Sequence, residues 1–227
     1  MSFFATLTED GSYALTAGGY TALTLIMLGL LILSCFLTKA DQRFKMGTRR
    51  LVFSGIALAL AFVTSFIKLF HLPMGGSVTL FSMFFITLIG YFYGLGSGLT
   101  AAIAYGILQM IIDPYIISVP QMLCDYIFAF GALGLSGIFS NRRHGLTRGY
   151  VTGIIGRFVF SFLSGYIFFG MYAPEGMNPA AYSAVYNGSY IFTEGVLTLF
   201  VLMIPAVYNA VKRVKAMARA EEYTASK

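Results

Sequence analysis

The chain contains few of the residues that a soluble domain or a metal protein needs. Only 11% of its 227 residues are charged, nine of them acidic, and there are two cysteines and two histidines. Cys35 and Cys124 lie in hydrophobic runs, whereas structural disulfides belong mainly to oxidised extracellular segments. His71 and His144 are too far apart in the sequence to match the spacing of a metal site. The sequence therefore predicts no disulfide, no metal and no cofactor.

Hydrophobic residues, by contrast, dominate the composition. They make up 58% of the chain, which has 25 glycines, 22 phenylalanines and 15 tyrosines and a mean hydropathy of +0.78. This is the composition of an all-α integral membrane protein. A helix needs roughly 20 apolar residues to cross a bilayer core of about 30 Å. The hydrophobic runs predict seven spans, near 17–38, 51–70, 77–93, 97–112, 120–140, 150–171 and 184–210.

The distribution of basic residues predicts the orientation. Lys and Arg are concentrated in 39–50, 142–148 and 212–219. With seven spans these segments fall on one side, which the positive-inside rule makes cytoplasmic, so the N-terminus is expected outside and the C-terminus inside. The expected external connections contain no Lys or Arg. The net charge of +6 is thereby explained by topology and by attraction to anionic lipid, without nucleic-acid binding.

Asp125 lies near the start of the fifth predicted span. An ionised group there costs several kcal/mol unless it faces a cavity or a partner, so it indicates a functional site. Gln121 lies four residues earlier, on the same helix face. Aromatic and polar residues at the external ends of other spans are expected to face the same space: Tyr115, Tyr166, Phe169, Tyr182, Tyr186, Asn187, Tyr190 and Glu194.

A carboxylate ringed by aromatic faces suits a flat organic cation. Each desolvated aromatic face attracts a cation by up to about 2 kcal/mol, and the carboxylate supplies the opposite charge. An aromatic belt at the membrane interface is the alternative for the tyrosines, but it does not account for Asp125, Asn187 and Glu194. Arg157 lies deeper and is expected to snorkel or to pair within the bundle, with Glu194 as candidate partner, rather than to contact a ligand.

Small residues recur at a spacing of four in two predicted spans. Gly55 with Ala59, and the offset pair Ala57 with Ala61, lie in the second span. A longer stripe, Gly94, Gly98, Ala102 and Gly106, lies in the fourth. Helices in lipid approach closely where side chains are small. Packing within the bundle and docking of another membrane protein both fit these patterns.

Three segments, taken in order, carry a resemblance to a known family. They are Met74-Gly-Gly-Ser-Val78, the run 120–130 with Gly134-Leu-Ser-Gly137, and the run 165–174 followed by 181–188. Together they resemble the thiamine-specific substrate-binding (S) component of energy-coupling factor (ECF) transporters, the ThiT family, from about residue 48 to 212. The resemblance implies a six-helix membrane domain that binds thiamine near the external face of a bacterial plasma membrane. It also implies a transmembrane coupling subunit and two ATPases as partners.

The resemblance divides the chain into three parts. Residues 1–47 form an N-terminal transmembrane helix and a basic connection without counterpart in the family core. Residues 48–214 form the substrate-binding membrane domain, and residues 215–227 a cytoplasmic tail. The small-residue face that contacts the coupling subunit in S components matches Gly55 and Ala59, with Ala57 and Ala61 as the competing register.

The resemblance also implies roles for individual residues. Asp125 matches the acidic ligand of the family, and Tyr126 its neighbouring tyrosine. Phe169 and Gly76 stand where some relatives have tryptophans, which this chain lacks entirely, and Ser161 stands in place of a histidine. The complete predicted site comprises Asp125, Tyr126, Tyr115, Gln121, Gly165, Phe169, Tyr182, Asn187, Ser161 and Glu194.

Other function classes fit the sequence less well. The run 134–137 matches the Gly-x-Ser-Gly of intramembrane serine proteases, but both histidines lie in connections and a base within hydrogen-bond reach is required. No phosphate loop of Walker type is present, so ATP-driven transport needs separate ATPases. A self-sufficient secondary carrier would more often show inverted repeats or broken helices. An S component for another small heteroaromatic vitamin or precursor is the remaining alternative.

Overall fold

A computed structural model describes residues 5–7, 13–18, 21 and 48–220. Two short strands, β1 (Ala5–Leu7) and β2 (Tyr13–Leu15), pair antiparallel. The predicted first span, 17–38, lies almost wholly outside the described residues.

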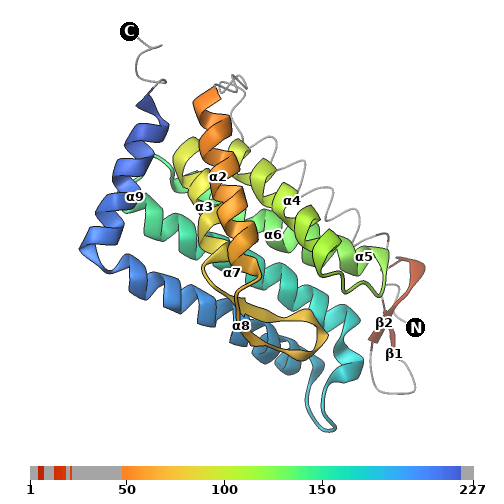
Figure 1. Cartoon of the computed structure of the whole chain (residues 1–227). Coiled ribbons are helices and arrows are strands. Elements are labelled where there is room, and N and C mark those ends of the chain that lie inside the picture. Colours follow the sequence, from red (N-terminus) through yellow and green to blue (C-terminus); the bar gives the residue numbers. More distant parts are fainter. Residues whose placement is uncertain (1–4, 8–12, 19–20, 22–47, 221–227) are drawn as a thin grey trace.

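Residues 48–220 form a helical bundle with one hairpin (Figure 1). Its helices are α2 (Thr48–Ser65), α3 (Ser82–Tyr93), α4 (Leu95–Ile112), α5 (Val119–Met122), η2 (Leu123–Phe128), α6 (Ala129–Gly131), η3 (Ala132–Phe139), α7 (Gly145–Phe168), η4 (Gly170–Tyr172), α8 (Pro179–Leu202) and α9 (Pro205–Ala218).

The all-α membrane fold predicted from the sequence is confirmed. In the described part of the chain, α2, α4, α7 and the continuous segment 119–139, which comprises α5, η2, α6 and η3, are long and apolar enough to cross a membrane. The pair α8 and α9 adds a fifth span if it is counted as one. The apolar helix α3 has 12 residues. At 1.5 Å per residue it is about 18 Å long, shorter than a bilayer core of about 30 Å. The count of seven spans stays a prediction.

Three predicted spans differ from expectation. The run 184–210 is not one helix, because α8 ends at Leu202 and α9 begins at Pro205 with a bend of 90°. Proline has no backbone N–H and disfavours helix in the residue before it, so the chain turns there. The external ends of the second and third predicted spans form a hairpin instead, with strands β3 (Lys68–His71) and β4 (Ser77–Thr79) around the turn η1 (Pro73–Gly75).

The small residues of α4 pack inside the bundle, against the segment 119–139. A Cβ added to Gly98 would lie 2.7 Å from the carbonyl oxygen of Gly134, and one added to Gly106 would overlap the carbonyl oxygen of Tyr126. Ser136, the serine of the protease-like motif, donates a 2.9 Å hydrogen bond to the carbonyl of Thr87. These contacts account for the glycines and the motif by close helix packing.

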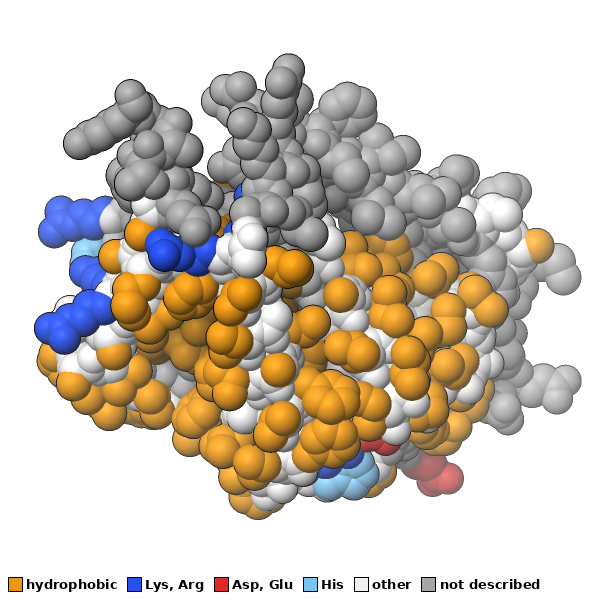
Figure 2. Space-filling model, turned by 45° about the horizontal axis from the view of Figure 1, so that its top comes forward, with side chains coloured by type: hydrophobic (Ala, Val, Ile, Leu, Met, Phe, Trp, Pro, Cys, Tyr) orange, Lys and Arg blue, Asp and Glu red, His pale blue; other side chains and the backbone are white. Residues whose placement is uncertain are grey.

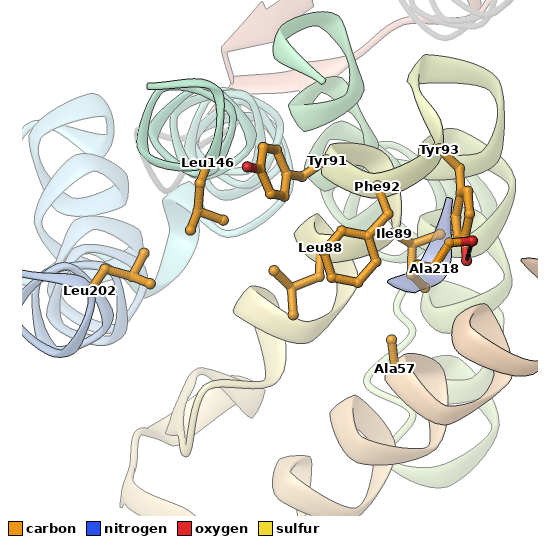
Figure 3. Close-up of a cluster of buried hydrophobic side chains, with 9 residues drawn as sticks. All are labelled: Ala57, Leu88, Ile89, Tyr91, Phe92, Tyr93, Leu146, Leu202 and Ala218. Carbon is orange, nitrogen blue, oxygen red and sulfur yellow. Dashed lines mark hydrogen bonds between the residues drawn. The ribbon is translucent and has the colours of Figure 1, made fainter. Parts of the chain in front are cut away.

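The two small-residue registers of α2 face opposite ways. Ala57 and Ala61 are buried, 6% and 0% exposed, and Figure 3 shows Ala57 turned toward the apolar cluster that it forms with α3. Gly55 and Ala59 are exposed, and a Cβ at Gly55 would meet no atom within 4 Å. The alternative prediction that Ala57 and Ala61 form the docking face is therefore wrong, because both side chains are buried in the core of the bundle.

Charged and apolar side chains are segregated on the surface. Figure 2 shows a broad band of hydrophobic side chains, with most of the visible Lys and Arg toward one edge of the molecule and a further basic side chain beside a histidine at the lower edge. Exposed apolar residues such as Val63 (58%) and Phe200 (64%) are ordinary where a surface contacts lipid. The helix α9 packs its inner face, through Val207 and Val211, on the core cluster of α3 and α7. Lys212 and Arg213 of the same helix are exposed.

Candidate functional site

A cavity of about 130 Å³ lies among the hairpin, α4, the segment 119–139, α7 and α8. Its outer wall is formed by the ends that the sequence places outside, at Gly75, Tyr115, Phe169 and Tyr182. The structure brings nine of the ten predicted site residues to this one space. They are Tyr115, Gln121, Asp125, Tyr126, Ser161, Gly165, Phe169, Tyr182 and Asn187.

Gln121 positions Asp125. The side-chain Nε2 of Gln121 donates to Asp125 Oδ2 at 2.6 Å and to the carbonyl of Tyr115 at 3.0 Å. Its Oε1 accepts a hydrogen bond from the backbone N–H of Ile117 at 3.1 Å, and Ser118 Oγ caps the helix start by accepting from Gln121 N at 3.3 Å. An amide held by the preceding loop thus orients the carboxylate without neutralising its charge.

Tyr126 and Tyr115 form the wall beside Asp125. Tyr126 Oη donates to the carbonyl of Asp113 at 3.0 Å and accepts from the backbone N–H of Tyr115 at 2.7 Å. This ties the 113–118 connection down against the helix. The ring of Tyr115 lies 5.8 Å from that of Phe169, with 30° between their planes. The two rings, tilted relative to each other, border the outer part of the cavity.

α7 and α8 form another part of the wall. Asn187 Nδ2 donates to the carbonyl of Ser183 at 3.0 Å, and Asn187 Oδ1 accepts from Tyr190 Oη at 2.8 Å. A Cβ on Gly165 would overlap Ser183 Oγ and lie 2.8 Å from Asn187 Nδ2. Glycine at 165 is therefore required for the two helices to approach closely at the cavity.

The hairpin is tied to α8 across the cavity mouth. Tyr186 Oη donates to the carbonyl of Pro73 and accepts from the backbone N–H of Gly76 at 3.0 Å. A Cβ on Gly76 would lie 2.7 Å from that hydroxyl oxygen, so a side chain at 76 would push the loop and the tyrosine apart. Tyr182, Tyr186 and Tyr190 form the continuous aromatic stripe that their spacing predicts, with ring centroids 6.0 and 5.9 Å apart.

Glu194 is the predicted site residue that the structure does not place in the cavity wall. It is 2% exposed, and its carboxylate accepts from Thr79 N at 3.1 Å, Thr79 Oγ1 at 2.6 Å, Met83 N at 3.0 Å and Ser82 Oγ at 3.5 Å. These donors satisfy both carboxylate oxygens. Glu194 holds the start of α3 behind the cavity wall, and the expected pairing with Arg157 is wrong.

Comparisons with known proteins identify the family of the chain. The family model described as Thiamine transporter protein (Thia_YuaJ) matches residues 51–214. The chain belongs to the thiamine transporter family. A thiamine transporter ThiT of Bacillus subtilis (strain 168) is 32% identical over 171 residues, which cover 68% of this chain and 88% of that protein. A thiamine transporter ThiT of Lacticaseibacillus paracasei is 28% identical over 126 residues, or 48% of this chain and 63% of that protein.

A solved structure shares the fold. ThiT from Listeria monocytogenes superposes with a TM-score of 0.59 at 24% identity, covering 70% of this chain and 96% of that one. The thiamine transporter family is a transport family, not an enzyme family.

The cavity of this thiamine transporter family member also contains residues that the sequence did not predict. Arg157 lines it, although snorkelling or pairing within the bundle was expected. The sequence pattern that could have predicted this position is the spacing of four residues between Arg157, Ser161, Gly165 and Phe169, which places them along one face of α7. Four further lining residues, Gly75, Ser77, Phe130 and Ser183, lie in segments that carry the family resemblance but were not named as site residues. The others lie outside those segments: Ser65, Lys68, Thr79, Ser82, Tyr105, Gln109 and Asp113.

Proposed function

We propose that this chain is the membrane-embedded capture subunit of an ATP-driven ECF importer and that it binds thiamine from outside a bacterial plasma membrane. The observation that supports it best is Asp125, a carboxylate held by Gln121 in a cavity between aromatic walls. Thiamine is a cation built from two flat heteroaromatic rings joined by a methylene group, which matches a carboxylate beside π-faces. The relatives of the chain are named thiamine transporters.

The aromatic walls supply the surfaces that such a ligand needs. Tyr115 and Phe169 form one ring pair at the cavity, and Tyr182 and Tyr186 form another. Phe169 replaces the tryptophan that some relatives carry, so stacking is retained on a smaller ring. Asn187 and Ser161 add polar groups for a heterocycle, which favours thiamine over a ligand without hydrogen-bonding ring atoms.

The energy-coupling partners in this proposal are those that the resemblance to ECF S components implies. No Walker-type loop occurs in the sequence, so hydrolysis of ATP requires separate subunits. The exposed face at Gly55 and Ala59 permits close approach of another helix and is the proposed docking face for a coupling subunit. Two ATPases complete the proposed complex.

Mass spectrometry of the ligand retained by the purified protein tests the substrate. Thiamine is the expected ligand, and isothermal titration of ligand-free protein should show one site per chain. Retention of another heteroaromatic vitamin, with no thiamine binding, would keep the S-component assignment and change the ligand.

Reconstituted vesicles test the transport mode. Uptake of labelled thiamine should require the coupling subunit, both ATPases and ATP. The ATP must be on the side of the vesicle membrane that corresponds to the cytoplasm. Uptake by this chain alone would favour the secondary-carrier alternative and contradict the proposal.

A further inference from the structure

Arg157 is the innermost residue of a stripe that α7 presents to the cavity. Phe169, at the end of α7, and Gly165, Ser161 and Arg157 follow one another at intervals of four, and all line the cavity. At 1.5 Å per residue, Arg157 lies about 18 Å further in than Phe169 along the helix axis. The guanidinium therefore faces the inner end of the space that Asp125 and the aromatic walls border.

The guanidinium has a face contact but lacks an acceptor. Its Cζ lies 4.2 Å from the ring centroid of Phe130, and this ring packs edge-on against Tyr105 at 5.3 Å. The ring stabilises the positive charge through its π-face. The ring does not accept hydrogen bonds from the N–H groups that lie in the guanidinium plane. The buried Nε of Arg157 has no hydrogen-bond partner. A buried donor without an acceptor destabilises the protein unless a ligand or water supplies one.

Neither nearby carboxylate supplies that acceptor. Glu194 is engaged by Thr79, Ser82 and Met83. Asp125 is held by Gln121, and no ion pair joins either acid to Arg157, all three residues being in the described part of the chain. Ser82, Tyr105 and Tyr190 line the cavity too, so this inner end combines one unpaired guanidinium with several hydroxyl groups. This group of side chains suits an oxygen acceptor of a ligand.

We propose that Arg157 contacts the bound ligand and donates to an oxygen carried on its cationic ring, a step that rests on the proposed function. A cationic ring is attracted to Asp125 and repelled by the guanidinium, so its charge stays at the carboxylate. The hydroxyethyl substituent of the thiazolium ring then extends inward, where its oxygen meets Arg157. The neutral aminopyrimidine occupies the aromatic outer part, beside Phe169 and Tyr182. Arg157 thereby determines the direction in which the ligand binds.

A cycle that combines protein variants with ligand analogues tests this contact. The ligands are thiamine and its deoxy analogue, in which an ethyl group replaces hydroxyethyl, titrated by calorimetry into detergent-purified full-length chain. The variants are Arg157→Met and Arg157→Lys. Arg148→Met is the matched control, because Arg148 is an exposed arginine on the same helix, at its cytoplasmic end.

The wild type is expected to bind the deoxy analogue about tenfold or more weakly than thiamine, as charge-assisted hydrogen bonds are strong. Arg157→Met should lose a similar factor for thiamine and nothing further for the analogue, and this retained analogue binding shows that the variant is folded. Arg157→Lys should recover part of the loss, and Arg148→Met should bind like wild type.

Two results would overturn the inference while leaving the proposed function in place. One is an unchanged thiamine affinity in Arg157→Met. The other is that Arg157→Met weakens binding of the deoxy analogue by as large a factor as it weakens binding of thiamine. Failure of the wild type to bind thiamine would instead overturn the proposed function, and the inference with it.

Discussion

Glu194 and Thr79 connect the last long helix to the hairpin that closes the cavity. Thr79, the final residue of β4, donates to the same carboxylate oxygen of Glu194 through its backbone N–H at 3.1 Å and its hydroxyl at 2.6 Å. The other oxygen accepts from Met83 N at the start of α3. One buried acid thus orients the hairpin, α3 and α8 relative to one another, and the cavity wall depends on it.

Glu194→Gln should destabilise the protein by about 1–3 kcal/mol, because an amide nitrogen would replace one acceptor and leave a buried donor unsatisfied. The thermal unfolding midpoint in detergent should fall, and thiamine binding should weaken as the hairpin loosens. Glu175→Gln is the control, since Glu175 is exposed in the 172–178 connection. Equal unfolding midpoints for the two variants would show that the carboxylate contributes little.

Asp125→Asn should weaken thiamine binding about tenfold or more, equivalent to at least about 1.4 kcal/mol. The substitution keeps the shape and removes the charge, and charge-assisted hydrogen bonds are about twice as strong as neutral ones. Asp113→Asn provides a comparison at the cavity rim, where the carboxylate is 52% exposed and 2.5 Å from Lys68 Nζ. Its effect should be much smaller, as exposed ion pairs contribute about 0–1 kcal/mol. If Asp125→Asn titrates like wild type, Asp125 is not the anchor.

Phe169→Ala should reduce affinity substantially, whereas Phe169→Trp should retain or improve it, because a larger π-face strengthens stacking on a ligand ring. The measurement is a titration of each variant with thiamine. Phe169→Leu separates stacking from simple packing, because leucine fills space without a π-face. A leucine variant as good as phenylalanine would assign the residue to packing alone.

Gly165→Ala should weaken binding and lower thermal stability, since the new methyl would overlap Ser183 Oγ and force α7 and α8 apart. Overpacking of this kind costs about 1–3 kcal/mol. The double variant Gly165→Ala with Ser183→Ala removes the overlapping hydroxyl and should recover part of the stability. Additive losses in the double variant would mean that the two positions do not clash.

Leucine at both Gly55 and Ala59 should abolish ATP-driven uptake by the assembled transporter and leave thiamine binding nearly intact. Bulky side chains on this exposed face prevent close helix approach by a partner. Leucine at both Ala57 and Ala61 is the matched control: these positions are buried, so binding and uptake should be lost together through misfolding. Preserved uptake in the first double variant would place the docking face elsewhere.

Much of the candidate site could be predicted because helical spacing carries it. Gln121 and Asp125 are one turn apart, and a carboxylate near a membrane span has few structural explanations. Glu194 was assigned to the ligand for the same reason, and wrongly. Its partners Thr79 and Met83 lie more than a hundred residues away in the sequence, and two of its bonds come from backbone N–H groups, which no residue pattern reveals.

The sequence by itself determined that the chain is a helical membrane protein, that its basic residues gather in three segments, and that Asp125 is a candidate site residue. Composition and periodicity suffice for this, because each spanning helix must satisfy its own backbone and bury apolar residues in lipid. Only the tertiary structure decided which pair on α2 faces outward and that Arg157, not Glu194, faces the cavity. Those outcomes depend on how helices rotate about their axes when they pack, and rotation is set by contacts between distant segments.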